Sequence, residues 1–235
     1  MDSIGKPAFK TIQQDCLIFG IYENNKTASV IGNFSAKGDI LIPKFIKHNS
    51  QEYLITSIAH NSFENTKNLN TIIFPQDSSV QIIEKYAFSQ SSIQKVKFPS
   101  SVSIICEAAF IRCYQLKQVE FPEDSKLQNI ERLAFKDTAI ESITIPQHIT
   151  QINEAVFRHC TKLTQVTYHP DSELTKVCRF AFYECKIENL FVPKKVTLID
   201  EYAFASNLAL KHIEFEDDSN LQIIGKHAFQ HTSIE

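Results

Sequence analysis

The residues of this 235-residue sequence whose types and spacing could do chemistry are its cysteines and a set of Asp-Ser pairs. Cys106 and Cys113 are separated by the same interval as Cys178 and Cys185, with six residues between the partners. Zinc sites usually place about two to four residues between paired cysteines, so this spacing argues against a metal. Disulfide frameworks are typical of much shorter secreted chains, so an even number of cysteines carries little weight here.

The Asp-Ser pairs recur every 47 residues. They are Asp77-Ser78, Asp124-Ser125, Asp171-Ser172 and Asp218-Ser219. One interpretation is a ridge that binds calcium or a substrate. Equivalent residues two strands apart in a stacked sheet would be separated by roughly 9–10 Å, whereas calcium needs oxygen ligands at about 2.3–2.6 Å. We therefore favour turns that each Asp or Ser side chain closes locally.

No set of side chains indicates a catalytic centre. The eight histidines fall at unrelated positions, and no Ser/His/Asp or Cys/His set shares a local frame. The five glycines do not form a phosphate-binding loop. We expect a non-enzymatic protein without a metal or a cofactor.

Phenylalanines at regular intervals indicate the fold that holds the cysteines and the Asp-Ser pairs in place. They are Phe63, Phe88, Phe110, Phe135, Phe157, Phe182, Phe204 and Phe229. The gaps between them alternate between 25 and 22 residues, and an aliphatic residue stands five positions before each. Periodicity of this length is the signature of stacked structural repeats. The spacing predicts a solenoid of about eight rungs.

Each repeat also contains a short segment of the form L-x-x-I-x-F, which alternates apolar and polar residues as a half-buried strand does. A proline usually follows, which cannot donate to a strand ladder and so marks the strand's end. These prolines are Pro75, Pro99, Pro122, Pro146 and Pro193. We expect a mainly β, right-handed, curved solenoid, with a parallel sheet on one face and short strands or 3₁₀ turns on the other.

Small polar residues occupy the third position after each repeat phenylalanine. They are Thr66, Ser91, Cys113, Thr138, Cys160, Cys185, Asn207 and Thr232. A buried turn needs hydrogen-bonding partners for its backbone, and short polar side chains supply them. This ladder predicts that three of the cysteines are buried and reduced. Cys160 and Cys185 would lie on adjacent rungs within disulfide range, but with parallel side chains that disfavour a bond.

The two ends of the chain depart from the repeat. Residues 1–50 are predicted to form an N-terminal cap, in which residues 16–22 and 28–32 make a hairpin around residues 23–26. The solenoid is expected over residues 51–235, and it stops without a cap where the next strand should begin. Either the chain is truncated there, or another subunit covers the rung, which invites self-association.

Charge and hydropathy exclude several classes of partner. The net charge of −3 does not point to nucleic acid or to an anionic membrane. No apolar run approaches the roughly 18–20 residues of a membrane-spanning helix, and the first residues contain no signal-peptide core. Asn25 and Asn33 stand in short glycosylation sequons, which are weak indications of secretion.

The repeat resembles the BspA-like leucine-rich repeat family, whose pattern is L-x-x-I-x-I-P-x-x-V-x-x-I-x-x-x-A-F-x-x-C. The matching residues are 140–146, Ile149, Ile152, Val156-Phe157 and Cys160. The resemblance implies a surface-exposed or secreted adhesin that contacts host-cell or matrix proteins, and the low glycine content favours the family's protozoan branch. An intracellular interaction scaffold, favoured by the missing signal sequence and the unpaired cysteines, is the alternative.

Side chains that point outward from the predicted strands are the candidate protein-binding face. One column is Thr71, Lys95, Gln118, Ser142, Gln165, Asn189 and His212. The other column is Ile73, Lys97, Glu120, Thr144, Thr167, Phe191 and Glu214. These positions vary freely in size and charge, as expected of a recognition surface. Ile73 and Phe191 are large apolar residues at positions that should not contribute to the core. We expect Phe191 to anchor a protein partner.

Overall fold

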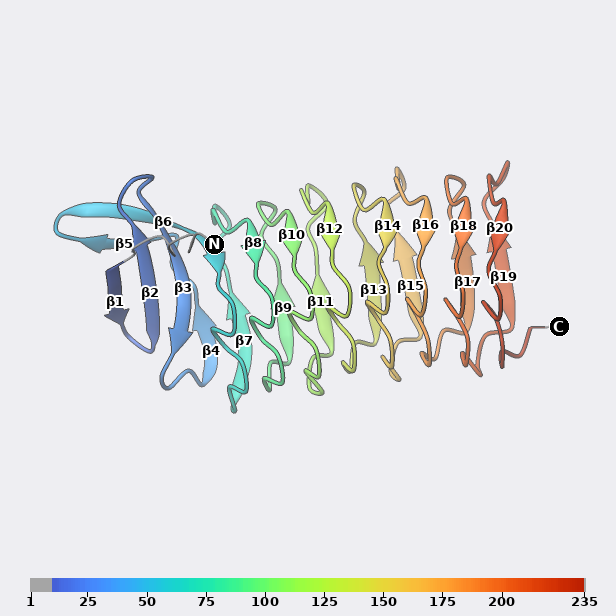
Figure 1. Ribbon diagram of the computed structural model, residues 1–235, viewed down its shortest axis with the longest axis horizontal. Helices are drawn as coiled ribbons and strands as arrows, with labels where there is room; N and C mark the ends of the chain where they lie inside the picture. Colours follow the sequence, from blue (N-terminus) through green and yellow to red (C-terminus); the bar gives the residue numbers. More distant parts are fainter. Residues whose placement is uncertain (1–9, 235) are drawn as a thin grey trace, which may run out of the picture.

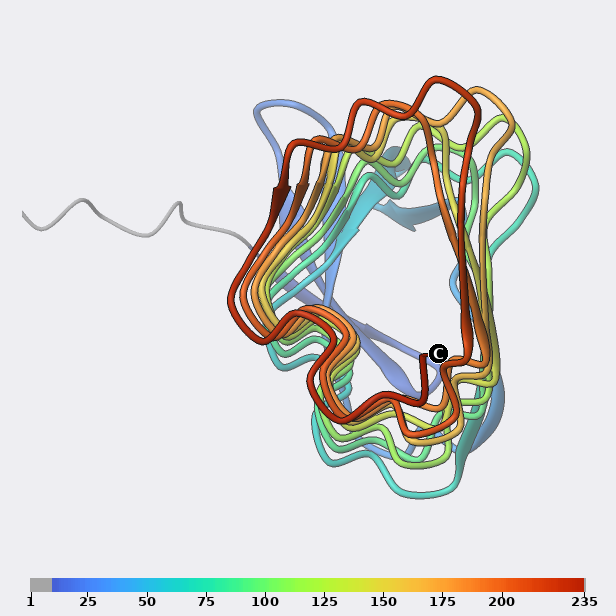
Figure 2. The same cartoon turned by 90° about the vertical axis from the view of Figure 1, so that its right-hand side faces the viewer.

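The computed structural model describes residues 10–234, which contain strands and turns but no helix. Figure 1 shows the strands side by side in one elongated stack, with β1–β3 toward one end and β19 and β20 at the other. Viewed along the stack, successive rungs overlay with a gradual rotation (Figure 2). The predicted β-solenoid of about eight turns is confirmed.

The longer strands form one face of the stack. They are β4 (Gly38–Leu41), β7 (Leu69–Ile73), β9 (Lys95–Lys97), β11 (Gln118–Glu120), β13 (Ser142–Ile145), β15 (Gln165–Tyr168), β17 (Asn189–Val192) and β19 (His212–Phe215). We call this the wide face. Its parallel pairing is interrupted twice, because β11 is not paired with β13 and β15 is not paired with β17.

Two-residue strands form the opposite, narrow face. They are β8 (Ile82–Ile83), β10 (Ile104–Ile105), β12 (Asn129–Ile130), β14 (Gln151–Ile152), β16 (Lys176–Val177), β18 (Leu198–Ile199) and β20 (Ile223–Ile224). They pair in parallel in two ladders, β8–β10–β12 and β14–β16–β18–β20. Of the two predicted possibilities for this face, the described residues form short strands rather than 3₁₀ turns.

The repeat phenylalanines stack at the turn that leads from the narrow face back to the wide one. Phe135 is fully buried, and its ring centroid lies 5.3 Å from that of Phe110 and 5.7 Å from that of Phe157. The backbone at this turn forms a third column of hydrogen bonds between rungs. Ala108 and Arg112 adopt left-handed conformations, with φ of 56° and 57°, and their N–H groups donate to Arg132 and Lys136 carbonyls.

Five further strands lie at the N-terminal end. Three of them, β1 (Lys10–Gln14), β2 (Leu17–Tyr22) and β3 (Thr27–Asn33), form an antiparallel meander. β5 (Phe45–His48) pairs antiparallel with β6 (Gln51–Ile58), and β6 also pairs in parallel with β3 and β8. The division into a cap and a repeat array stays a prediction, because β6 joins both. Residues 1–9 and Glu235 lie outside the described residues.

The inward columns are buried through the middle of the stack and open at two places. Ile224 is 55% exposed although its equivalents in the middle of the stack are buried, because no further described rung covers it. Self-association through this rung stays a prediction. One inward column stands at the end of the wide-face strands. Its members Phe98, Ile145 and Val192 are buried. In the alternate rungs the equivalent residues Phe74, Phe121 and Tyr168 are only half-buried, and Phe215 is exposed. The expected inward orientation is therefore incomplete in alternate rungs, where the longer Asp-Ser loops follow the strand and leave the ring partly uncovered.

Candidate protein-binding face

The two predicted columns lie on the outside of the wide face. In β13, Ile143 and Ile145 are buried while Ser142 and Thr144 are exposed, as period-2 alternation requires. The strand register places Thr71 beside Lys95 and Lys95 beside Gln118. In the other column Lys97 adjoins Glu120, Thr144 adjoins Thr167, and Phe191 adjoins Glu214.

Side chains in the middle of the wide face bond to one another. Lys95 Nζ lies 2.7 Å from Glu120 Oε1, and the hydrogen bond from Lys95 lowers the pKa of the Glu120 carboxyl. Both side chains are more than 40% exposed, so the pair contributes little to stability. The hydroxyl oxygens of Thr144 and Thr167 lie 2.8 Å apart. This region is therefore polar and internally paired.

Phe191 lies beside the unpaired seam between β15 and β17, with 37% of its surface exposed. A surface hollow of about 490 Å³ opens there. Among its lining residues are six of the predicted ones, namely Gln165, Thr167, Asn189, Phe191, His212 and Glu214. The structure thus brings six of the fourteen predicted residues together around Phe191.

Of the other predicted residues, Ser142 and Thr144 lie in β13, and six lie toward the N-terminal end of the same face. These six are Thr71, Ile73, Lys95, Lys97, Gln118 and Glu120. Ile73 is 44% exposed and pairs in register with Leu41 of β4, which is 58% exposed. Sequence reasoning left Leu41 out of the column because it assigned residues 1–50 to the cap. The signal was Ile40-Leu41-Ile42-Pro43, which has the strand-then-proline form of the repeats.

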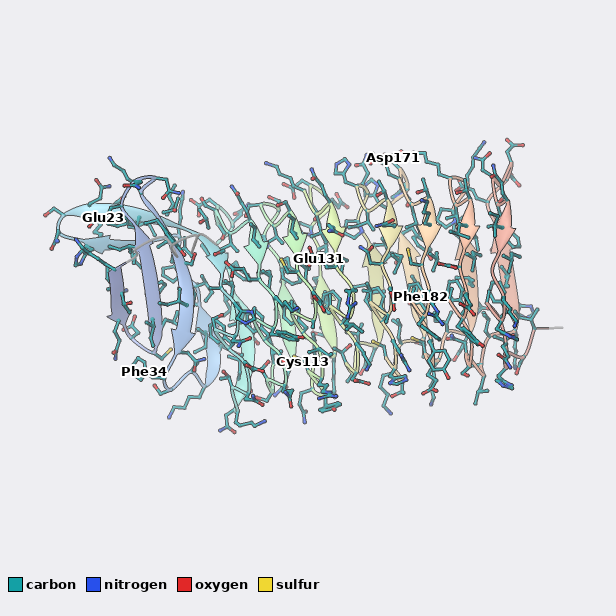
Figure 3. The ribbon with its side chains drawn as sticks, viewed as in Figure 1. Glu23, Phe34, Cys113, Glu131, Asp171 and Phe182 are labelled. Carbon is teal, nitrogen blue, oxygen red and sulfur yellow. The ribbon has the colours of Figure 1, made fainter. Side chains whose placement is uncertain are left out.

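The polar ladder performs a structural role at the inner side of the phenylalanine turn, and Figure 3 shows Cys113 and Phe182 within the stack. Cys113 Sγ donates to the Phe88 carbonyl at 3.0 Å, and Cys160 Sγ donates to the Phe135 carbonyl at 3.2 Å. Burial raises the pKa of both thiols to about 12. The predicted burial of the three ladder cysteines is confirmed, and all six cysteines are free in this structure.

Serine turns close the longer loops, which lie at one edge of the stack near Asp171 (Figure 3). Ser78, Ser125 and Ser172 each accept, at 3.3 Å, the N–H of the residue two positions later. Two of the aspartates pair instead with lysines, at 2.6 Å for Lys44–Asp77 and 3.2 Å for Lys194–Asp218. The predicted serine turns are confirmed. Within residues 10–234, no group of three His, Cys, Asp or Glu side chains could hold a metal ion.

Comparison with known families identifies the repeat. The family model described as a BspA type leucine-rich repeat region matches six copies, over residues 44–164 and 128–235. The chain belongs to the BspA-type leucine-rich repeat family. Its members are repeat proteins that serve as protein-interaction modules rather than as enzymes. No curated protein matches this BspA-type chain in sequence.

Solved structures share the fold of this BspA-type protein. The pneumococcal vaccine antigen PcpA matches 91% of this chain and 51% of its own, with a TM-score of 0.63 and 22% identity. A leucine-rich cell surface protein from Faecalibacterium prausnitzii matches 90% of this chain and 55% of its own, with a TM-score of 0.61 and 21% identity. A leucine-rich repeat protein from T. pallidum has a TM-score of 0.52 and 16% identity, covering 92% of this chain and 86% of its own. The BspA-type chain spans about half the length of the first two proteins. Residues 10–234 contain no helix able to span a bilayer.

Proposed function

We propose that this protein binds another protein across the wide face, and that Phe191 anchors the contact. The observation that supports this is the partly exposed ring of Phe191 between two surface hollows of about 490 and 550 Å³. Exposed aromatic residues in such settings are frequent hot spots of protein interfaces. The surrounding exposed side chains, such as Gln165 and His212, provide the polar rim that such anchors usually have.

The test is binding of the purified protein to immobilised host matrix proteins, with Phe191→Ala as the variant. Truncating a hot spot costs roughly 2 kcal/mol or more, so we expect affinity to fall about thirtyfold with little change in melting temperature. Leu208→Ala is the matched control, because Leu208 is 72% exposed but lies outside the wide face. If Phe191→Ala binds normally while Asp171→Ala does not, the binding surface is the loop edge.

The cellular role that we propose is that of a surface-exposed or secreted, adhesin-like protein that contacts host proteins. Support comes from the family and from the similarity in fold to a bacterial cell surface protein. Labelling of intact cells with a membrane-impermeant reagent should then modify this protein. A lack of labelling in intact cells, followed by labelling after lysis, would contradict the proposal.

An intracellular interaction scaffold is the second candidate. The observation that favours it is that all six cysteines are free, since thiols persist in reducing compartments. The same labelling experiment separates the two roles, because a scaffold is modified only after lysis.

A further inference from the structure

Two equivalent hollows lie along the edge where the wide-face strands end. The first, of about 410 Å³, is lined by Phe121, Thr144, Pro146 and Tyr168 among others. The second, of about 550 Å³, is lined by Tyr168, Phe191, Pro193 and Glu216 among others. Thr144 and Pro146 of the first correspond to Phe191 and Pro193 of the second, 47 residues later. The hollows are therefore one site that the repeat has duplicated.

Tyr168, His169 and Pro170 line both hollows, so they form the wall between them. Tyr168 is half-buried, and burial raises the pKa of its hydroxyl, which therefore stays protonated. Its hydroxyl has no hydrogen-bond partner among residues 10–234. A hydroxyl that is partly removed from water and unpaired gains most from an acceptor that a ligand brings.

Equivalent points of the two hollows are two rungs apart, which is about 9.6 Å at the ~4.8 Å spacing of paired strands. Only the step from β13 to β15 is paired, and the step from β15 to β17 crosses the unpaired seam. A polyproline II helix advances ~3.1 Å per residue and has three residues per turn, so residues i and i+3 lie about 9.3 Å apart on one side. The two periods are therefore of similar length, and every third residue of such a helix faces the same side. Such a helix also has no internal hydrogen bonds, so its carbonyls are free to accept from a hydroxyl such as that of Tyr168.

We propose that these two hollows bind a proline-rich segment of a partner protein in the polyproline II conformation. Prolines at positions i and i+3 occupy the hollows over Pro146 and Pro193, and a carbonyl between them accepts the hydroxyl of Tyr168. Aromatic and proline rings on the floor and wall supply the apolar contacts that proline-rich ligands use. This site specifies the kind of partner, and so it rests on the proposed protein-binding function.

The probe is fluorescently labelled decaproline, titrated against the full chain, with a Gly-Ser peptide of equal length as the control. We expect saturable binding of decaproline alone. Tyr168→Phe removes the hydroxyl and retains the ring, and it should weaken binding about tenfold, the effect of losing one hydrogen bond. Tyr114→Phe is the matched control, because Tyr114 is 65% exposed and lines neither hollow. It should bind like the unmodified protein.

A second pair of peptides tests the spacing without any variant. Prolines at every third position among alanines should bind several times more tightly than prolines at every fourth position. The proposal is overturned if decaproline does not saturate, if Tyr168→Phe binds as well as Tyr114→Phe, or if both spacings bind equally. Binding of a soluble oligosaccharide at these residues in place of decaproline would also overturn it.

The failure of this inference can be told apart from failure of the proposed function. If decaproline does not bind while Phe191→Ala still weakens a matrix-protein partner, protein binding across the wide face stands and the proline site is wrong. If decaproline binds as expected but Phe191→Ala leaves a protein partner unaffected, the proline site stands without the wide-face contact.

Discussion

Phe135 and Phe191 belong to the same stack of rungs but lie in regions that constrain them differently. Phe135 is fully buried at the phenylalanine turn, where seven of the eight repeat phenylalanines are fully or almost fully buried. Phe191 lies on the wide face, where the equivalent residues of neighbouring rungs are Thr167 and Glu214. The difference shows that packing against the rungs above and below dictates the residue type at the turn. The outer face is left free to vary, and this freedom is what recognition requires.

The largest effect should come from Phe135→Ala. Removing a buried phenylalanine costs about 3–5 kcal/mol of unfolding free energy, because contacts are lost and a cavity remains. Urea denaturation of Phe135→Ala beside Phe191→Ala measures the contrast directly. Equal stability of the two variants would mean that the turn and the wide face have been assigned the wrong way round.

A smaller effect is expected for Asn207→Ala in the polar ladder. The Asn207 amide donates to the carbonyls of Phe182 and Phe204, both at 2.8 Å, and its oxygen accepts the Ile187 N–H at 3.1 Å. Truncation leaves these buried groups unpaired, and we expect a loss of about 2–3 kcal/mol. Asn189→Ala, at an exposed position of the wide face, is the matched control and should melt as the unmodified protein does.

The buried thiols should make stability depend on pH in the alkaline range. In the folded protein the pKa of Cys160 is raised to about 12 from 9.0, so above about pH 9 the unfolded chain loses protons that the folded one retains. Stability contributed by each such thiol is complete below pH 9 and falls as pH rises, by about 1.4 kcal/mol per pH unit. Threonine occupies the same ladder position at Thr138. Cys160→Thr should therefore reduce the slope of unfolding free energy against pH by the contribution of one thiol. An unchanged slope from pH 9 to 10.5 would show that Cys160 ionises in the folded state.

The smallest effect is expected for Thr167→Val on the wide face. Thr167 is exposed, and its contact with the Thr144 hydroxyl can be replaced by water. Surface substitutions of this kind usually change stability by less than about 0.5 kcal/mol. Thermal melting measures it, and a loss comparable to that of Asn207→Ala would remove the distinction between the two regions.

Much of the fold was predictable because the type of residue at each repeat position indicates whether its side chain is buried or exposed. A buried column restricts its members to a few residue types, so the recurrence of Phe, the aliphatic five positions earlier and the small polar residue three positions later was visible without coordinates. The outward columns followed from strand alternation. The serine turns followed because Ser78 and its equivalents bond within their own loop.

Features that depend on two rungs together could be known only from the tertiary structure. Leu133 and Phe180 adopt φ of 62° and 56°, which costs energy for such side chains and is not indicated by any glycine. Hydrogen bonds between rungs compensate, since the N–H groups of Leu133 and Phe180 donate to the carbonyls of Glu154 and Glu201. The seam between β15 and β17 and the hollows beside Tyr168 have the same origin. The sequence determines which side chain each rung places on the wide face. The spacing between two rungs depends on how their backbones pack and hydrogen-bond with each other.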